Sequence, residues 1–347
     1  MSVKFIHVFA QVSLVSIVVH VMWFSWVTII SLLVVVLPSP LRNTGVQHHY
    51  DPPRHIHVSI QGPQSLAVSW SSSQPCTPHV QWSVLGASGS PSEQTTTATA
   101  LAQDSKIYQY NNYISPWFHK VVLHNVPTNA RVQYRCGDGD ANWSPRQTIH
   151  TAGDASSSSP TRLVVVGDLG QTTHTQHILH TIDQLPHPLH AVLVPGDLSY
   201  AECDQDLWDK WGNIMSVLSS RVPLMVAPGN HDVEYYCARD NFDATAQKFL
   251  SYCSRYIMPH TCGEHTEPGD ELTPELTVTK QSERQVLPPY ENAQRHTHTP
   301  RLWYSFDVGY VHVISLCSDC DVAPDSLQVQ VRARVHLLVQ QHMVVYC

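Results

Sequence analysis

Three short polar strings, each directly after a run of apolar residues, constrain the fold of this 347-residue chain more than any other feature. The apolar runs at 163–166, 191–194 and 222–227 are rich in β-branched residues and bounded by Gly or Pro, which is typical of buried strands. Stretches able to form helices separate them, so the pattern predicts a βαβαβ unit with neighbouring parallel strands. The strings that follow the runs are Gly167-Asp168-Leu169-Gly170, Gly196-Asp197-Leu198-Ser199-Tyr200 and Gly229-Asn230-His231-Asp232.

The polar residues of these strings suit a metal site. The carboxyl ends of parallel strands meet at one edge of a sheet, and ligands bind at that edge. Asp168, Asp197, Tyr200 and Asn230 offer oxygen atoms that hard metal ions prefer, and the glycines let the backbone turn tightly beside an ion. Asp and Asn are also ordinary turn residues after a strand. Three such strings in this order nevertheless favour a metal site.

The strings resemble the metal-ligand blocks of the metallophosphoesterases, and Tyr200 narrows the resemblance to the purple acid phosphatases. That family carries five blocks: Gly-Asp-x-Gly, Gly-Asp-x-x-Tyr, Gly-Asn-His-Asp/Glu, Val-x-x-His and Gly-His-x-His. The first three occur here without substitution. Val339-Gln340-Gln341-His342 is the candidate for the fourth block, with Tyr346 at the family spacing and Val344 in place of a Pro.

The resemblance implies a centre of Fe(III) and a divalent metal, which would be Zn, Mn or Fe. Asp168 and Tyr200 would bind the ferric ion, and Asp197 would bridge the two ions. Asn230 and His342 would bind the divalent ion. His231 would face the substrate phosphate and protonate the leaving group. The implied protein is an acid phosphatase that hydrolyses phosphate monoesters, because two cations neutralise the ester and lower the pKa of water.

The fifth block is missing, since no Gly-His-x-His precedes Cys347. The resemblance assigns one imidazole of that block to each metal, so we expect this chain to bind metal substoichiometrically and to hydrolyse an aryl phosphate slowly. Two alternatives stay open: a catalytically impaired phosphatase-like protein that acts as a binding module, and a truncated gene model. An adhesion module built on a β-sandwich leaves the three polar strings unexplained.

A different pattern precedes the strings. Short alternating segments between Gly, Pro, Ser and Asn turns predict an antiparallel β-sandwich over residues 41–153, with Trp70 in its core. The resemblance adds that this sandwich is fibronectin-III-like. Ser-rich residues 154–160 predict a linker to an α/β metallophosphoesterase domain at 161–347, a layered β-sheet sandwich flanked by helices and incomplete at its C-terminus. Within it, the polar stretch 261–300 predicts a surface insertion.

Residues 1–40 predict a signal peptide or a signal-anchor. Lys4 precedes a mostly apolar stretch over residues 5–37, which is longer than a secretory h-region and long enough to span a bilayer. We therefore expect a secreted or membrane-anchored protein, extracellular or vacuolar. Nine Cys and the glycosylation acceptor Asn142 agree with the secretory route. Cys317 and Cys320 are expected to be disulfides or plain thiols, because no second pair completes a zinc site.

Composition narrows the partners. A net charge of −8 and the absence of a basic run argue against nucleic acid as a partner. The phosphate ester expected as substrate is implied by the resemblance. The 42% of apolar residues can supply a core for more than one domain. No pattern in the sequence indicates an oligomeric state.

Overall fold

The structure is a computed structural model that describes residues 51–86, 89, 105–139, 142–154, 159–234, 249–259, 302–318 and 328–329, and the backbones of 11–12, 15–16, 96–99 and 342–346. The chain divides into two compact units, Met1–His49 and Tyr50–Cys347. In the first unit, β1 (Gln11–Val12) pairs antiparallel with β2 (Val15–Ser16). The rest of the predicted apolar segment 5–37 lies outside the described residues. In the part of the chain that is described, none of the helices combines the length and apolarity needed to cross a membrane.

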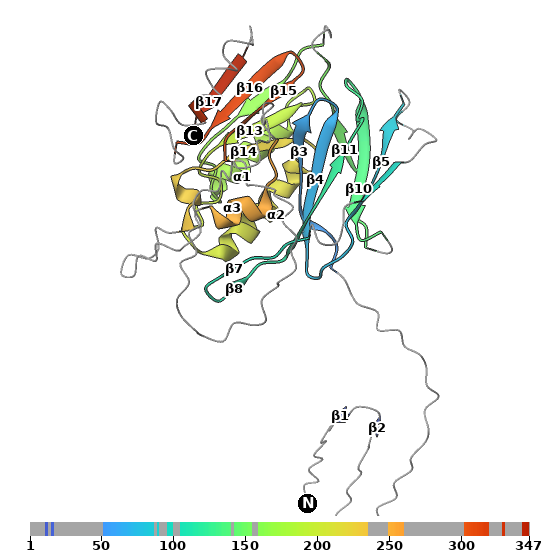
Figure 1. The fold of residues 1–347 in the computed structure, drawn as a ribbon, viewed down its shortest axis with the longest axis vertical. Coiled ribbons are helices and arrows are strands. Elements are labelled where there is room, and N and C mark those ends of the chain that lie inside the picture. The colour runs from blue at the N-terminus through green and yellow to red at the C-terminus, as the bar shows by residue number, and fades with distance from the viewer. Residues whose placement is uncertain are drawn as a thin grey trace, which may run out of the picture. The chain divides into compact units, whose positions relative to one another are not determined.

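The second unit begins with a β-sandwich of two antiparallel sheets (Figure 1). One sheet has the order β3 (Arg54–Gly62), β4 (Ser65–Ser72), β9 (Trp117–Leu123). The other has the order β11 (Gln147–His150), β10 (Arg131–Gly137), β5 (His79–Leu85), β6 (Thr96–Thr99). Trp70 and Tyr134, one from each sheet, are fully buried and belong to the same apolar cluster. The predicted sandwich and its Trp70 core are confirmed.

A two-stranded hairpin, β7 (Gln109–Tyr110) and β8 (Tyr113–Ile114), leaves the sandwich before β9. Its register pairs Tyr110 with Tyr113 across Asn111, which has a left-handed φ of 51°. Asn tolerates that conformation, which a tight hairpin turn requires. The hairpin therefore carries two tyrosines side by side at its tip.

The second domain contains the predicted parallel unit. Strands β12 (Leu163–Val165), β13 (Ala191–Pro195) and β14 (Leu224–Ala227) lie in that order, and both pairings are parallel. Helix α1 (Thr173–Asp183) connects the first two strands, and α2 (Gln205–Ser219) connects the next two. A short 3-10 helix, η2 (Asn230–Asp232), follows β14, and α3 (Leu250–Arg255) comes after it. The three polar strings therefore follow the ends of adjacent parallel strands, as predicted.

Local signals explain where the helices begin. Thr172 caps α1 in a reciprocal capping box with Thr175, and Asp204 caps α2 by accepting the N–H of Asp206. Helix α2 then buries one face at helical spacing, namely Trp208, Trp211, Met215 and Leu218. Helix α2 packs on β3 of the sandwich, and β14 also contacts β3, so β3 lies at the junction of the two domains.

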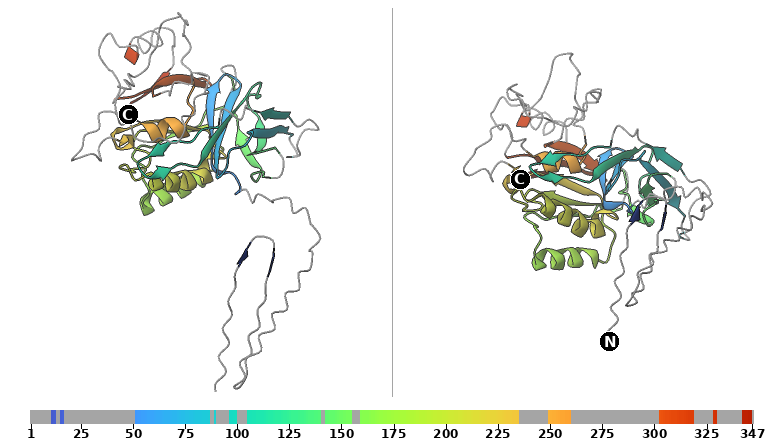
Figure 2. Two further views of the ribbon diagram at one scale, coloured as in Figure 1. Left: turned by 60° about the horizontal axis from the view of Figure 1, so that its bottom comes forward. Right: turned by 90° about the horizontal axis from the view of Figure 1, so that it is seen from below.

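A second sheet lies on the other side of the parallel sheet from α1 and α2 (Figure 2). It contains β15 (Tyr304–Val308), β16 (Val311–Leu316) and β17 (His342–Tyr346), with β15 antiparallel and β17 parallel to β16. The Tyr304 hydroxyl donates to the Val226 carbonyl of β14 at 2.8 Å, and Tyr252 of α3 donates to the same carbonyl at 2.9 Å. These layers agree with the expected sheet sandwich flanked by helices.

One strand differs from its prediction. The run 163–166 is predicted as buried, but the side chain of Val165 in β12 is 48% exposed. Strand β12 is the edge strand of the parallel sheet in the described part of the chain. An apolar run alone cannot distinguish an edge strand from a central one.

The predicted domain limits stay predictions. Residues 155–158 of the expected linker and the whole of the expected insertion 261–300 lie outside the described residues. Cys203 and Cys317 are disulfide-bonded, whereas Cys76, Cys136 and Cys253 are free thiols. The expectation for Cys317, a disulfide or a plain thiol, is thereby settled as a disulfide.

Candidate metal centre

Three of the predicted ligands meet at the carboxyl edge of the parallel sheet. The Tyr200 hydroxyl lies 2.8 Å from Asp168 Oδ1 and 3.1 Å from Asp197 Oδ2. The two carboxylates come from the loops after β12 and β13, and both lie near the phenol of Tyr200, which is 32 positions after Asp168. Asp168 is exposed, and Asp197 and Tyr200 are half-buried. The edge thus presents oxygen atoms to solvent from three side chains at once.

The backbone at this edge is strained. Asp168, Asp197 and Tyr200 have left-handed φ angles of 55°, 52° and 51°. Such angles cost about 1–2 kcal/mol for residues other than Gly, although Asp tolerates them better than Tyr does. Strained residues that cluster in one place indicate a function that holds them there.

Two glycines make room for these side chains. A Cβ at Gly229 would lie 2.3 Å from Asp197 Oδ1 and 2.4 Å from Asp197 N, so only Gly fits there. Gly170 has a φ of 54°, and a Cβ on it would approach the Tyr200 ring at 3.3 Å. The glycines of the strings therefore have a steric role, because they let the loops approach one another.

Asp232 ties the second and third strings together, a role that sequence reasoning missed. Its buried carboxylate accepts the N–H groups of Leu198 at 3.0 Å and Gly229 at 2.9 Å. Burial raises the pKa of Asp232 to about 7, and the charge of Asp197 acts in the same direction, while the N–H donors oppose it. The only sequence signal was its place in Gly229-Asn230-His231-Asp232.

His231 lies beside the three oxygen ligands. Its backbone N–H donates to Asp197 Oδ1 at 2.9 Å, and its ring stacks on that of Tyr200 with centroids 4.5 Å apart. Its Nδ1 donates to Glu202 Oε1 at 2.6 Å. Glu202 has a left-handed φ of 48°, and sequence reasoning missed it because no local pattern pairs residues 29 positions apart.

Asn230 precedes His231 on η2, and its side chain is exposed. Because the His231 N–H bonds Asp197, the backbone of Asn230 lies next to the same carboxylate. The structure therefore brings the loops of all three strings to one place. The ligand roles of these residues stay predictions.

His342 is placed differently. It begins β17, and its backbone pairs with that of His312. His312 lines a cavity of about 470 Å³ together with His190 and Pro223, which precede β13 and β14. The start of β17 thus lies toward the amino edge of the parallel sheet. The side chain of His342 lies outside the described residues, so its role as a ligand stays a prediction that this backbone placement does not favour.

The donor set at the carboxyl edge fits a hard metal ion. In the described residues no three His, Cys, Asp or Glu side chains are grouped for a metal, and the set consists of two carboxylates and a phenol with a neighbouring Asn. Oxygen donors of this kind suit Fe(III) or a hard divalent ion. Partial burial and hydrogen bonds to Asp168 and Asp197 raise the pKa of Tyr200. The phenol proton thus lies between carboxylates, where a cation is electrostatically favoured.

Two family models match the chain. Residues 161–307 match the model for the calcineurin-like phosphoesterases, so the α/β domain is of the metallophosphoesterase class. Residues 53–151 match the model for the N-terminal domain of purple acid phosphatases. The two matches confirm the resemblance to purple acid phosphatases and the predicted order of a β-sandwich followed by a metallophosphoesterase domain. The fibronectin-III-like character of the sandwich stays a prediction.

Individual relatives agree. The chain is 28% identical over 293 residues to purple acid phosphatase 22 of Arabidopsis thaliana, covering 84% of this chain and 55% of that protein. It is 27% identical to purple acid phosphatase 1 of Ipomoea batatas, covering 66% and 46%. The solved structure of the phosphatase PPD1 from yellow lupin superposes with a TM-score of 0.57 at 16% identity, covering 82% and 48%, which shows the fold alone. The chain spans about half the length of the curated relatives it matches.

Proposed function

We propose that this chain is a phosphomonoesterase that works through a binuclear centre of Fe(III) and a divalent metal at the carboxyl edge. The observation that carries the proposal is that the Tyr200 hydroxyl lies within 3.1 Å of a carboxylate oxygen from both Asp168 and Asp197. Strained backbone at all three positions supports a functional reason for that meeting. A phosphate ester is the substrate class that the family relationship supports.

Each residue has a proposed role. Asp168 and Tyr200 would hold the ferric ion, and Asn230 would hold the divalent ion. Asp197 would be shared by the two ions, because its Oδ2 lies 3.1 Å from the Tyr200 hydroxyl of the second string and its Oδ1 accepts the His231 N–H of the third. When bound, the two ions neutralise the ester and lower the pKa of water. His342 remains a candidate ligand from its sequence motif alone.

His231 is the proposed general acid. Glu202 accepts the proton on Nδ1, which fixes the orientation of the ring and leaves Nε2 for the leaving-group oxygen. Stacking on Tyr200 restricts the ring further. A His held by a carboxylate on one nitrogen and facing substrate with the other is a common arrangement for proton transfer.

We also propose that the protein enters the secretory pathway. The disulfides at Cys203 and Cys317 support an oxidising compartment. Residues 5–37 are the proposed signal or membrane anchor. Asn142 is the proposed glycosylation site; its amide now donates to Asp138 Oδ2 at 2.6 Å, so an attached glycan would have to replace that contact.

The test is metal content, visible absorption and hydrolysis of an aryl phosphate at pH 5 for the whole chain. We expect hydrolysis above that of Asp197→Asn, which loses the bridging carboxylate and both metals. Tyr200→Phe should lose the visible band and keep some metal. His231→Ala should keep metal and lower turnover by roughly 10²–10⁴-fold.

The outcomes separate the alternatives. Metal binding without any hydrolysis above the Asp197→Asn variant favours the impaired, binding-module alternative. Absence of metal from the wild-type chain contradicts the binuclear proposal. Loss of metal in His231→Ala equal to that in Asp197→Asn would show that His231 is a ligand and not the acid.

A further inference from the structure

The β7–β8 hairpin of the first domain contacts the loop that carries Asn230 and His231. The Tyr110 hydroxyl donates to the carbonyl oxygen of Glu234 at 2.9 Å, although the two residues are 124 positions apart. Tyr110 is half-buried, so this contact lies at the junction of the hairpin with the α/β domain. Glu234 follows η2 by two residues. Tyr110, on the hairpin that precedes β9, therefore contacts the segment directly after the third polar string.

Glu234 is an anchor for that segment. It is 2% exposed, and its carboxylate accepts the N–H of Leu250 at 2.9 Å and of Ser251 at 2.7 Å, the first two residues of α3. Within the same segment, the Asp232 carboxylate accepts the N–H groups of Leu198 and Gly229. The backbone from Gly229 to Glu234 is therefore fixed at its start by Asp232 and at its end by Glu234, where the Tyr110 hydrogen bond is also made.

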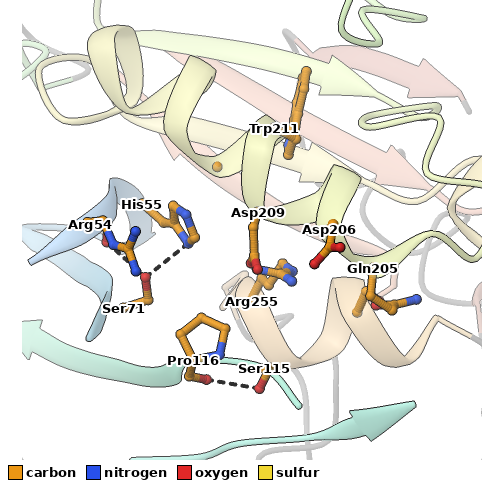
Figure 3. Close-up of polar contacts among 12 residues, drawn as sticks. Arg54, His55, Ser71, Ser115, Pro116, Gln205, Asp206, Asp209, Trp211 and Arg255 are labelled. Atoms are coloured by element: carbon orange, nitrogen blue, oxygen red, sulfur yellow. Dashed lines mark hydrogen bonds and ion pairs between the residues drawn. The ribbon is translucent and has the colours of Figure 1, made fainter. Parts of the chain in front are cut away.

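The hairpin itself is held rigidly. The Tyr113 hydroxyl donates to Asp209 Oδ2 at 2.9 Å, and Arg255 Nη2 donates to the Tyr113 hydroxyl at 3.2 Å. Arg255 is buried and pairs with Asp209 at 3.0 Å (Figure 3). Tyr108, just before the hairpin, donates to Gln205 Oε1 of α2 at 2.7 Å. These contacts join the hairpin to α2 and α3, so it can act as a fixed support.

We propose that Tyr110 is a positioning residue for the metal-site loop: the hairpin fixes the segment 230–234 and thereby the position of Asn230 and His231. The proposal rests on the proposed function for the roles of those two residues. Asp168 and Tyr200 follow other strands. Cys203, three residues after Tyr200, also contacts the Glu234 carbonyl, with Sγ 2.6 Å from the oxygen, but that contact does not involve the Tyr110 hydroxyl and remains when the hydroxyl is removed. Removing the Tyr110 hydroxyl should therefore loosen the divalent side of the centre and leave the ferric side unchanged.

The first test is amide hydrogen exchange of the whole chain without added metal. In Tyr110→Phe, which keeps the ring, exchange in peptides covering 229–234 should be about five- to tenfold faster, as expected for one lost hydrogen bond. Peptides covering 196–200 should not change. Tyr113→Phe is the matched control, because it removes a hydroxyl of the same hairpin that contacts Asp209 and Arg255 rather than Glu234.

The second test is binding of Mn²⁺ alone by equilibrium dialysis, with the visible band of the ferric site recorded in parallel. Tyr110→Phe should weaken Mn²⁺ binding several-fold and keep the visible band, and Tyr113→Phe should change neither. Unchanged exchange at 229–234, a rise of equal size in Tyr113→Phe, or a rise throughout the chain would overturn the proposal. If no variant binds Mn²⁺ but exchange rises at 229–234 in Tyr110→Phe alone, the positioning role stands and the metal part of the proposed function fails.

Discussion

His57 makes the stability of this protein sensitive to acid. His57 lies on β3 at the domain junction and is 7% exposed. Its ring makes a tilted contact with the ring of Tyr256, with centroids 5.0 Å apart. Its Nδ1 donates to the His55 carbonyl at 2.9 Å, while Nε2 is buried without a partner. Burial lowers the pKa of His57 to about 4, and the charges of Lys120 and Arg255 act in the same direction.

The sign and size of the effect follow from proton linkage. In the unfolded chain a histidine titrates near 6.5, so below that pH the unfolded state binds a proton that the folded ring does not. The contribution of the neutral ring is complete above pH 6.5 and is lost as the pH falls toward 4. At about 1.4 kcal/mol per pH unit, the 1.5 units between pH 6.5 and pH 5 amount to about 2 kcal/mol. His55 and His119, whose pKa values burial lowers to about 3 and about 4, act in the same direction.

The assay is urea unfolding at pH 7 and pH 5 for the wild type, His57→Asn and His124→Asn. Asn keeps a donor near the Nδ1 position but cannot titrate, so the free energy of unfolding of His57→Asn should fall by about 2 kcal/mol less than that of the wild type. His124 is exposed, so the control should follow the wild type. A pH dependence in His57→Asn equal to that of the wild type would refute the argument.

Two further predictions concern single contacts. In Gly229→Ala the new Cβ would collide with Asp197 Oδ1 at 2.3 Å, so Mn²⁺ binding in dialysis should be lost, whereas Gly167→Ala, with its nearest neighbour at 3.6 Å, should bind as the wild type does. Equal binding by both variants would show that Asp197 can move without cost to the site. In Tyr134→Phe the Ser220 carbonyl loses its buried donor at 2.7 Å, so the free energy of unfolding should fall by about 1–3 kcal/mol. Tyr310→Phe, at an exposed position, should not change it, and equal effects of the two variants would contradict the assigned contact.

The parts of the site that the sequence predicts are those set by local patterns. Asp168 and Asp197 could be placed at one edge because apolar runs, glycines and helix-length spacers specify a parallel unit. Trp70 could be placed in the core because its neighbours alternate in polarity. In both cases the information lies within a few residues of the position concerned.

The parts that the sequence does not predict depend on contacts between distant residues. Glu202 meets His231 only after the parallel strands have paired, and Tyr110 meets Glu234 only after the hairpin has packed on the α/β domain. The exposure of Val165 depends on which strands lie beside β12 and not on its own composition. The register of β17, with His342 opposite His312, is likewise a property of sheet pairing.

Because Tyr200 has a left-handed backbone conformation, substitutions that stabilise the fold at this position would remove the proposed metal ligand. A φ of 51° costs a tyrosine about 1–2 kcal/mol that Gly or Asn would largely avoid. A library screened only for resistance to heat should therefore enrich Gly or Asn at position 200 and discard the phenol. Screens for more robust variants would have to fix positions 168, 197 and 200 beforehand, because their most stable replacements are those that dismantle the site.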